Sequence, residues 1–141
     1  LLKDRDRQHL VQMAIEGYPK FKVSDIEFYL PKPNYTINTL TYLKEKYPKK
    51  EFSLLIGGDN LTTFHKWKNY RKIIENYKIY VYKRPGCEVR DFENADITIL
   101  DAPQMEISSS FVRQAIKEGK DIRFFLPDTV YQYILKMGWW R

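Results

Sequence analysis

Apolar residues recur three and four positions apart in several stretches of this chain, which is the spacing of one buried helix face. The first stretch covers about residues 4–16 and stops at Gly17. The second begins at Thr36, a residue suited to a helix cap, and must end by Pro48. Further stretches predict helices over residues 64–77, from the serines at 108–110 onward, and over residues 127–137.

Runs rich in β-branched and aromatic residues stand between these helices and predict strands. They are FKVSDIEFYL (21–30), FSLLIGGDN (52–60), KIYVYKRPG (78–86) and ADITILDAP (95–103). Because strands and helices alternate throughout, we expect a Rossmann-like α/β fold, a parallel sheet with helices on both faces. Ligands of such sheets bind beyond the carboxyl ends of the strands, so GGDN, KRPG and ISSS should converge there.

The composition fits one compact domain. With 141 residues and 43% hydrophobic content the chain can bury a core, so we expect residues 1–141 to form a single domain. The excess of 24 Lys and Arg over 18 Asp and Glu gives a net charge of +6, which favours anionic partners of any kind. The lone Cys87 and the lack of an apolar run of about 18 residues predict a cytoplasmic protein that contacts no membrane.

Three serines open the helix in EISSSFVRQAIKEGKDI, residues 106–122. A helix N-terminus presents unpaired N–H groups and a partial positive charge, so hydroxyls there, with Arg113 one turn in, would suit a phosphate. The same pattern is explained by Ser108 or Ser109 acting as an ordinary cap, with Arg113 in solvent. Spacing alone leaves both interpretations open.

Two predicted strand ends carry residues with similarly open roles. Gly57 and Gly58 permit close backbone approach, and Asp59 can accept hydrogen bonds from ribose hydroxyls. A plain turn, with Asp59 capping the next helix, explains them equally well. Arg84 in KRPG could contact a phosphate or lie exposed before a turn.

Several stretches together resemble a known family. ISSSFVR is similar to the I-S-S-T-x-I-R signature of the nucleotidyltransferase α/β superfamily, with Ser110 in place of its threonine. The stretches YPKFKVSDIEF, PNYTINTL, LLIGGDNL, FHKWKNY and RPG resemble the bacterial nicotinate-nucleotide adenylyltransferases in order and approximate spacing. This resemblance covers nearly the whole chain.

The resemblance implies a reaction in which nicotinate mononucleotide attacks the α-phosphorus of ATP, with Mg²⁺ assisting, to give nicotinate adenine dinucleotide and pyrophosphate. Such catalysis rests on alignment and on stabilising phosphate charge. The resemblance assigns ATP binding to Ile107, Ser108, Ser109 and Arg113. It assigns mononucleotide binding to Thr36, Gly57, Asp59, Trp67 and Arg84.

Two of these assignments carry specific chemistry. Thr36 at a helix start would offer N–H groups and a hydroxyl to the nicotinate carboxylate. The alternative is that Thr36 is an ordinary helix cap, which the same geometry also satisfies. Trp67 would stack its indole on the pyridine ring, and packing in a helix core is the alternative.

One expected segment is missing from the sequence. The family has a G-x-F-x-P-x-H-x-G-H segment whose histidines contact the ATP phosphates, and neither His9 nor His65 has such neighbours. The chain also lacks an initiator methionine, so we expect that the N-terminal strand and this loop are absent. We therefore assign no catalytic residue and no metal ligand within the chain, and expect it to be inactive alone.

Other functions stay open. The acceptor could be nicotinamide mononucleotide or phosphopantetheine; the pyridine platform argues against the second, and the lack of an acid beside Thr36 in sequence favours nicotinate over nicotinamide. A non-catalytic nucleic-acid-binding domain would also be basic and aromatic, but its Lys and Arg would gather in a stripe. We expect ATP and nicotinate mononucleotide as partners and no nucleic acid, and a second copy of the chain is a further candidate partner.

Overall fold

The computed structural model describes residues 2–84, 86, 92 and 94–140, so Pro85 and Cys87 fall outside it. The chain forms two compact units. One unit joins Leu1–Asp25 to Ile107–Arg141, and the other comprises Ile26–Glu106. The organisation of residues 1–141 as one domain stays a prediction.

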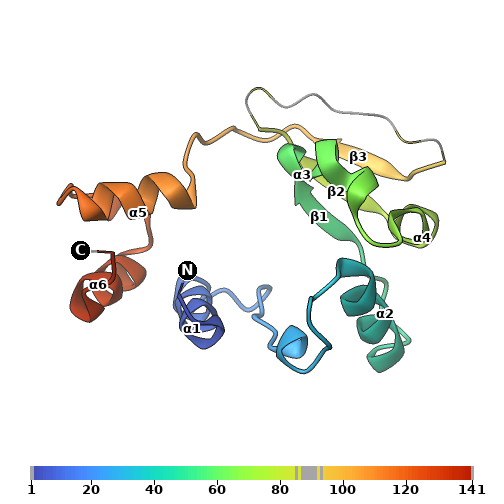
Figure 1. Cartoon of the computed structure of the whole chain (residues 1–141), viewed down its shortest axis with the longest axis horizontal. Coiled ribbons are helices and arrows are strands. Elements are labelled where there is room, and N and C mark those ends of the chain that lie inside the picture. The colour runs from blue at the N-terminus through green and yellow to red at the C-terminus, as the bar shows by residue number, and fades with distance from the viewer. Residues whose placement is uncertain (1, 85, 87–91, 93, 141) are drawn as a thin grey trace. The chain divides into compact units, whose positions relative to one another are not determined.

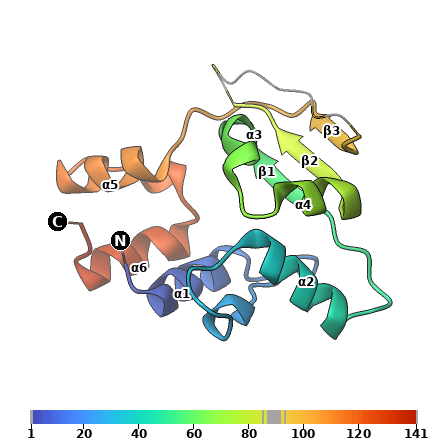
Figure 2. The ribbon, with the colours of Figure 1, turned by 45° about the vertical axis from the view of Figure 1, so that its right-hand side comes forward.

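The unit of residues 26–106 is built around a parallel sheet (Figure 1). Its strands are β1 (Leu54–Gly57), β2 (Ile79–Tyr82) and β3 (Ile97–Leu100), in the order β1-β2-β3. The register pairs Leu54 with Ile79 and Ile79 with Ile97, and Figure 2 shows the three arrows side by side. The predicted α/β fold with a parallel sheet is therefore confirmed.

The core of this unit lies on one face of the sheet. Ile56, Ile79 and Val81 alternate with outward residues along their strands and are buried among helical side chains. These come from α2 (Thr36–Lys46), α3 (Gly58–Thr63) and α4 (Tyr70–Asn76), and from the 3₁₀ turn η2 (Phe64–Lys66). The largest fully buried side chains of the core are Phe64, Leu61 and Ile73, together with Ile79 and Val81.

The other unit packs helices from both ends of the chain. It contains α1 (Asp4–Ala14), α5 (Ser109–Lys117), the 3₁₀ turn η3 (Arg123–Phe125) and α6 (Asp128–Met137). Helices α1 and α6 contact each other, as Figure 2 also shows. The core consists of Val112, Ala115, Ile116, Ile122, Val130, Tyr131 and Ile134, with Leu10, Met13 and Ala14 of α1 packed against it.

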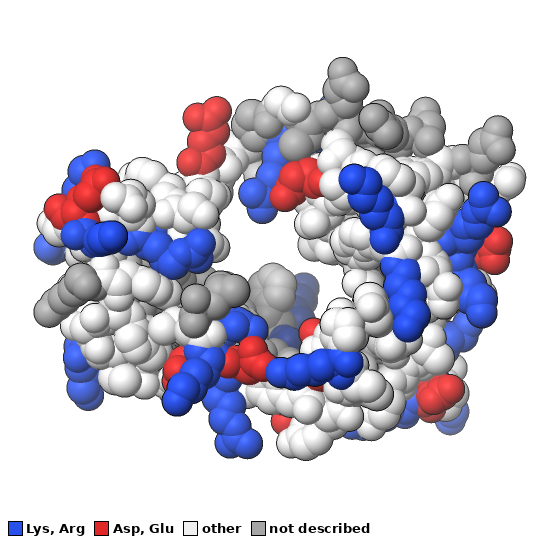
Figure 3. All heavy atoms as spheres, viewed as in Figure 1, with Lys and Arg blue, Asp and Glu red and all other residues white. Residues whose placement is uncertain are grey.

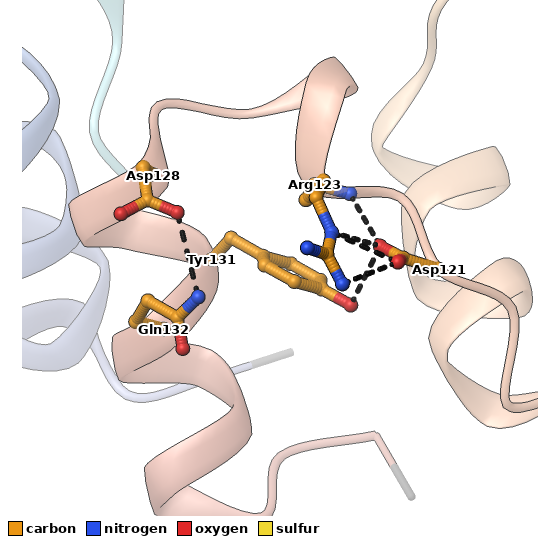
Figure 4. Close-up of polar contacts among 5 residues, drawn as sticks. All are labelled: Asp121, Arg123, Asp128, Tyr131 and Gln132. Atoms are coloured by element: carbon orange, nitrogen blue, oxygen red, sulfur yellow. Dashed lines mark hydrogen bonds and ion pairs between the residues drawn. The ribbon is translucent and has the colours of Figure 1, made fainter.

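A polar cluster ties the α5–α6 connection to α6 (Figure 4). Arg123 donates from its guanidinium to both carboxylate oxygens of Asp121, at 2.6–3.1 Å, and from its backbone N–H at 3.1 Å. Tyr131 of α6 adds its hydroxyl at 3.3 Å. The hydrogen-bonding Arg123 side chain holds the pKa of the Asp121 carboxyl below its usual range, so Asp121 is a charged staple.

Two predicted elements are wrong. The stretch 21–30 forms no strand; it contains the 3₁₀ turn η1 (Ile26–Phe28), and Ile26 is its one buried residue. Alternating apolar residues make a strand only where a neighbouring strand can pair with them. The predicted helix 64–77 is broken between η2 and α4, where Asn69 adopts the left-handed conformation with φ of 53°.

Two helix starts are shifted by one residue. Tyr35 is the cap residue of α2, and Thr36 is its first helical residue. Likewise Pro127 precedes α6, which begins at Asp128. Among the described residues, no helix combines the length and apolar character that a membrane span needs.

Candidate functional site

The start of α5 uses its serines in different ways. Ser108 is the cap residue, and its Oγ accepts a hydrogen bond from the Phe111 N–H at 3.1 Å. Arg113 donates from Nη2 to Ser110 Oγ at 3.2 Å, so its guanidinium is turned back toward the helix N-terminus. The ordinary capping role of Ser108 is therefore present in the structure, while phosphate binding by Arg113 stays a prediction.

A pocket of about 380 Å³ opens beside this helix start, within the unit of residues 1–25 and 107–141. All four predicted ATP-binding residues line it, namely Ile107, Ser108, Ser109 and Arg113. Its other walls are largely apolar and include Leu10, Val11, Val112, Leu126, Val130, Ile134 and Trp140. The pocket thus combines an apolar wall with hydroxyls and a cation.

Arg7 brings a second cation to the same pocket, which sequence reasoning missed. Its guanidinium pairs with Asp4 at 2.6 Å and donates to the Leu2 carbonyl at 2.8 Å. The signal was present in the spacing, because Arg7 lies three and four residues before Leu10 and Val11 on α1. A basic residue at the edge of an apolar helix face lies beside any pocket that this face lines, as Arg7 does here.

The carboxyl ends of β1 and β2 carry a second group of predicted residues. Arg84 follows β2 and Asp59 follows β1, and their side chains form an ion pair with Nε 3.3 Å from Oδ1. Gly57, the last residue of β1, lies directly beside both. The described residues of GGDN and KRPG therefore converge as predicted, with Pro85 outside them. ISSS belongs to the other unit, and its part in the convergence stays a prediction.

Trp67 and the start of α2 pack against the same core. The Trp67 ring lies 5.0 Å from the Phe64 ring between centroids, so the packing alternative for Trp67 is what the structure contains. Tyr35, which precedes Thr36, is also packed against this core, and Lys68 Nζ lies 4.3 Å from its ring centroid. Thr36 and Trp67 are thus held on one side of the core, each half-buried.

Charges of both signs surround the first turn of α2. Thr39 donates from Oγ1 to Glu27 Oε1 at 2.7 Å, one turn after Thr36. Lys68 stands over the neighbouring Tyr35 ring. The sequence argument that no acid stands beside Thr36 did not anticipate Glu27, so that argument no longer separates nicotinate from nicotinamide.

The remaining candidates for acid–base or metal chemistry are exposed. His9 is exposed and lies edge-to-face with Tyr133 at 4.9 Å between ring centroids, and His65 is exposed in η2. No group of three or more His, Cys, Asp and Glu side chains could hold a metal ion in the described part of the chain. On the face shown in Figure 3, Lys and Arg side chains are interspersed with acidic ones over each unit.

Known proteins are similar to this chain in sequence and in fold. The cytidylyltransferase-like family model matches residues 1–115. A probable nicotinate-nucleotide adenylyltransferase of Flavobacterium johnsoniae is 53% identical over 137 residues, which cover 95% of this chain and 71% of that protein. The match spans most of both chains, so the likeness concerns the whole sequence and not one motif.

Two solved structures share the fold. The nicotinic acid mononucleotide adenylyltransferase of Plasmodium falciparum, complexed with APC, matches with a TM-score of 0.81 at 18% identity, over 99% of this chain and 77% of its own. A Vibrio parahaemolyticus structure with the name nicotinate-nucleotide adenylyltransferase matches with a TM-score of 0.75 at 26% identity, over 99% and 72%. The predicted family is confirmed: this chain belongs to the cytidylyltransferase-like family and, within it, to the nicotinate-nucleotide adenylyltransferases.

Proposed function

We propose that this protein transfers the adenylyl group of ATP to nicotinate mononucleotide, giving nicotinate adenine dinucleotide and pyrophosphate. The observation that carries the site is that Ile107, Ser108, Ser109 and Arg113 line one pocket in a chain of this family. Its apolar wall suits a base and its polar edge suits phosphates. The family supports the choice of reaction.

The reaction needs no nucleophile from the protein. A phosphate oxygen of the mononucleotide forms a bond to the α-phosphorus of ATP, and the bond from that phosphorus to the pyrophosphate oxygen breaks. The pyrophosphate leaves with the electron pair, so negative charge on phosphate oxygens must be stabilised throughout. Arg113 can do so through two parallel hydrogen bonds, and the N–H groups of the α5 N-terminus add partial positive charge.

Arg7 fits the same task. It lines the pocket together with Arg113, and the carboxylate of Asp4 holds its guanidinium at 2.6 Å. Because an arginine has five N–H donors, the contacts to Asp4 and Leu2 leave others for an anion. Two cations flanking one pocket match the high charge of a triphosphate.

We assign the mononucleotide to the residues of the other unit. Arg84 and Asp59 at the strand ends would bind its phosphate and its ribose hydroxyls, with Gly57 beside them. Trp67, which is half-buried, would stack its indole on the pyridine ring, and Thr36 would offer its hydroxyl to the ring substituent. The ion pair of Asp59 and Arg84 and the shared core beneath Thr36 and Trp67 support this grouping.

Mg²⁺ would enter with ATP. The donor set of the described residues does not fit a resident ion, because no cluster of three or more His, Cys, Asp and Glu side chains occurs there. Mg²⁺ usually keeps several waters and binds through substrate phosphates, where it neutralises part of their charge.

We also infer that the protein works in the cytoplasm on free nucleotides. Interspersed charges on the visible surface support small anionic substrates over nucleic acid, whose binding favours a basic stripe (Figure 3). Association with a second copy of the chain stays a prediction.

The proposed function can be tested by measuring which mononucleotide the protein uses as the acceptor. The full gene product should be assayed with ATP and either nicotinate mononucleotide or nicotinamide mononucleotide, with dinucleotides separated by chromatography. We expect kcat/KM to be at least about tenfold higher for the nicotinate form, which corresponds to about 1.4 kcal/mol of discrimination. A preference for the amide would replace the acceptor, and no dinucleotide from either would reject the proposal.

A further inference from the structure

Gly57 occupies a position whose backbone does not require glycine. Its φ of −77° and ψ of 155° are ordinary extended values that any residue adopts. The restriction comes from the side chains around it. A Cβ built on Gly57 would lie 2.5 Å from Asp59 Oδ1 and 3.1 Å from Arg84 Nε, which is closer than van der Waals contact allows.

The two groups that fill this space are the members of the ion pair. Asp59 folds back over the end of β1 and meets Arg84, which follows β2. The side chains of Asp59 and Arg84 are 53% and 50% exposed, so the pair contributes little to stability. Its main effect is geometric, because it holds a flexible guanidinium at the carboxyl edge of the sheet.

We propose that Gly57 is a positioning residue, which acts by leaving room for Asp59 to hold Arg84 in the orientation that binds the substrate phosphate. This inference rests on the proposed function, in which Arg84 contacts the mononucleotide. The contact with Asp59 engages Arg84 through Nε, and within the part of the chain that the structure describes its two terminal nitrogens remain able to donate to phosphate oxygens. Gly57 itself need not touch the substrate.

The substitution Gly57→Ala isolates this role. Alanine fits the backbone, and the atom it would strike first is the end of the flexible Asp59 side chain, which can rotate away. The protein should therefore fold while the ion pair opens. In the full gene product we expect KM for nicotinate mononucleotide to rise about tenfold, with kcat and KM for ATP each changed less than about threefold.

A double-mutant cycle separates positioning from plain structural damage. If Gly57 acts through Arg84, then Gly57→Ala should add almost nothing to Arg84→Gln, and the double variant should match Arg84→Gln alone. The proposal would be overturned if the increases in KM of the two single variants multiplied in the double variant, or if Gly57→Ala left KM unchanged. Asp59→Asn, which keeps the size of the side chain and removes its charge, should also raise KM for the mononucleotide.

Two controls keep the outcomes distinct. Ser53→Ala, at an exposed position just before β1, should leave every constant at its wild-type value. Equal melting temperatures of Gly57→Ala and the wild type would confirm that the fold is intact. If the wild type uses no nicotinate mononucleotide, the proposed function fails; if it does and the cycle is multiplicative, only the role of Gly57 fails.

Discussion

Arg84 and Asp59 pair across the ends of two neighbouring parallel strands, with Nε 3.3 Å from Oδ1, although they are far apart in sequence. The register of β1 and β2 brings Gly57 opposite Tyr82, and each charged residue follows its strand by two positions. A parallel sheet therefore assembles a charged pair at its carboxyl edge from the first turn of α3 and the segment that follows β2. This relationship is the clearest link between the fold and the proposed chemistry.

Arg113 should matter for ATP and not for the mononucleotide. In the full gene product, Arg113→Ala should raise KM for ATP about 10- to 100-fold, because a charge-assisted hydrogen bond contributes roughly 1.5–3 kcal/mol. Arg113→Lys keeps the charge but loses the paired donors, so its KM for ATP should lie between that of the wild type and that of Arg113→Ala. Steady-state kinetics at varied ATP measures this, and an unchanged KM in Arg113→Ala would remove Arg113 from the site.

Ser108 and Ser109 should separate stability from binding. Ser108 caps α5 through Phe111, so Ser108→Ala should lower the free energy of unfolding by about 1 kcal/mol. Ser109 follows the cap and lines the pocket, so Ser109→Ala should leave stability within about 0.5 kcal/mol and raise KM for ATP. Urea unfolding and kinetics of both variants test this contrast. Equal stability losses would show that the capping assignment is wrong.

The Asp121 staple should make stability depend on pH. Its hydrogen bonds from Arg123 lower the pKa of Asp121 in the folded protein below the unfolded value of about 3.9. The stabilisation is therefore fully present above about pH 4 and is lost as the pH falls through the lower, folded pKa.

Asp121→Asn should thus be less stable than the wild type at neutral pH, and the difference should shrink below about pH 4. Arg123→Gln should weaken the dependence of stability on pH in the acidic range, because it removes the main cause of the lowered pKa of Asp121. Unfolding followed by circular dichroism from pH 2 to pH 7 gives both curves. Curves parallel to that of the wild type would mean that the staple does not form in solution.

Much of the fold was predictable because its signals are local. The strand LLIG is an apolar run that ends in glycine, and the stripe of Val112, Ala115 and Ile116 sets the buried face of α5. The stretch 21–30 misled because alternation cannot reveal whether a partner strand exists. The break at Asn69 was not predictable from the spacing of apolar residues, because a single residue in the left-handed conformation does not change that spacing. Asparagine tolerates this conformation better than most residues.

The candidate site was predictable in part for the same reason. Ser109 and Arg113 lie four residues apart on a single helix, so spacing could place them together. Arg7 and Glu27 enter their surroundings from elements distant in sequence, and no local pattern announces such contacts. The need for glycine at position 57 could not be predicted either, because the side chains that leave no room for a Cβ there belong to Asp59 in α3 and to Arg84 after β2.

The polypeptide of residues 1–141 should not make the dinucleotide by itself. Its two histidines, His9 and His65, are exposed and lie outside any H-x-G-H segment, so we expect neither of them to neutralise the transferring phosphate. Pyrophosphate release from ATP and nicotinate mononucleotide should equal the background rate. Turnover above background would show that the helix start with Arg113 and Arg7 suffices.

The most direct test of adenylyl transfer follows the α-phosphorus. The full gene product should be incubated with nicotinate mononucleotide and ATP labelled at the α-phosphate, and the products separated. The account predicts that the label appears in nicotinate adenine dinucleotide and that the released pyrophosphate is unlabelled. Label that stays in ATP, or appears only in free AMP, would contradict it.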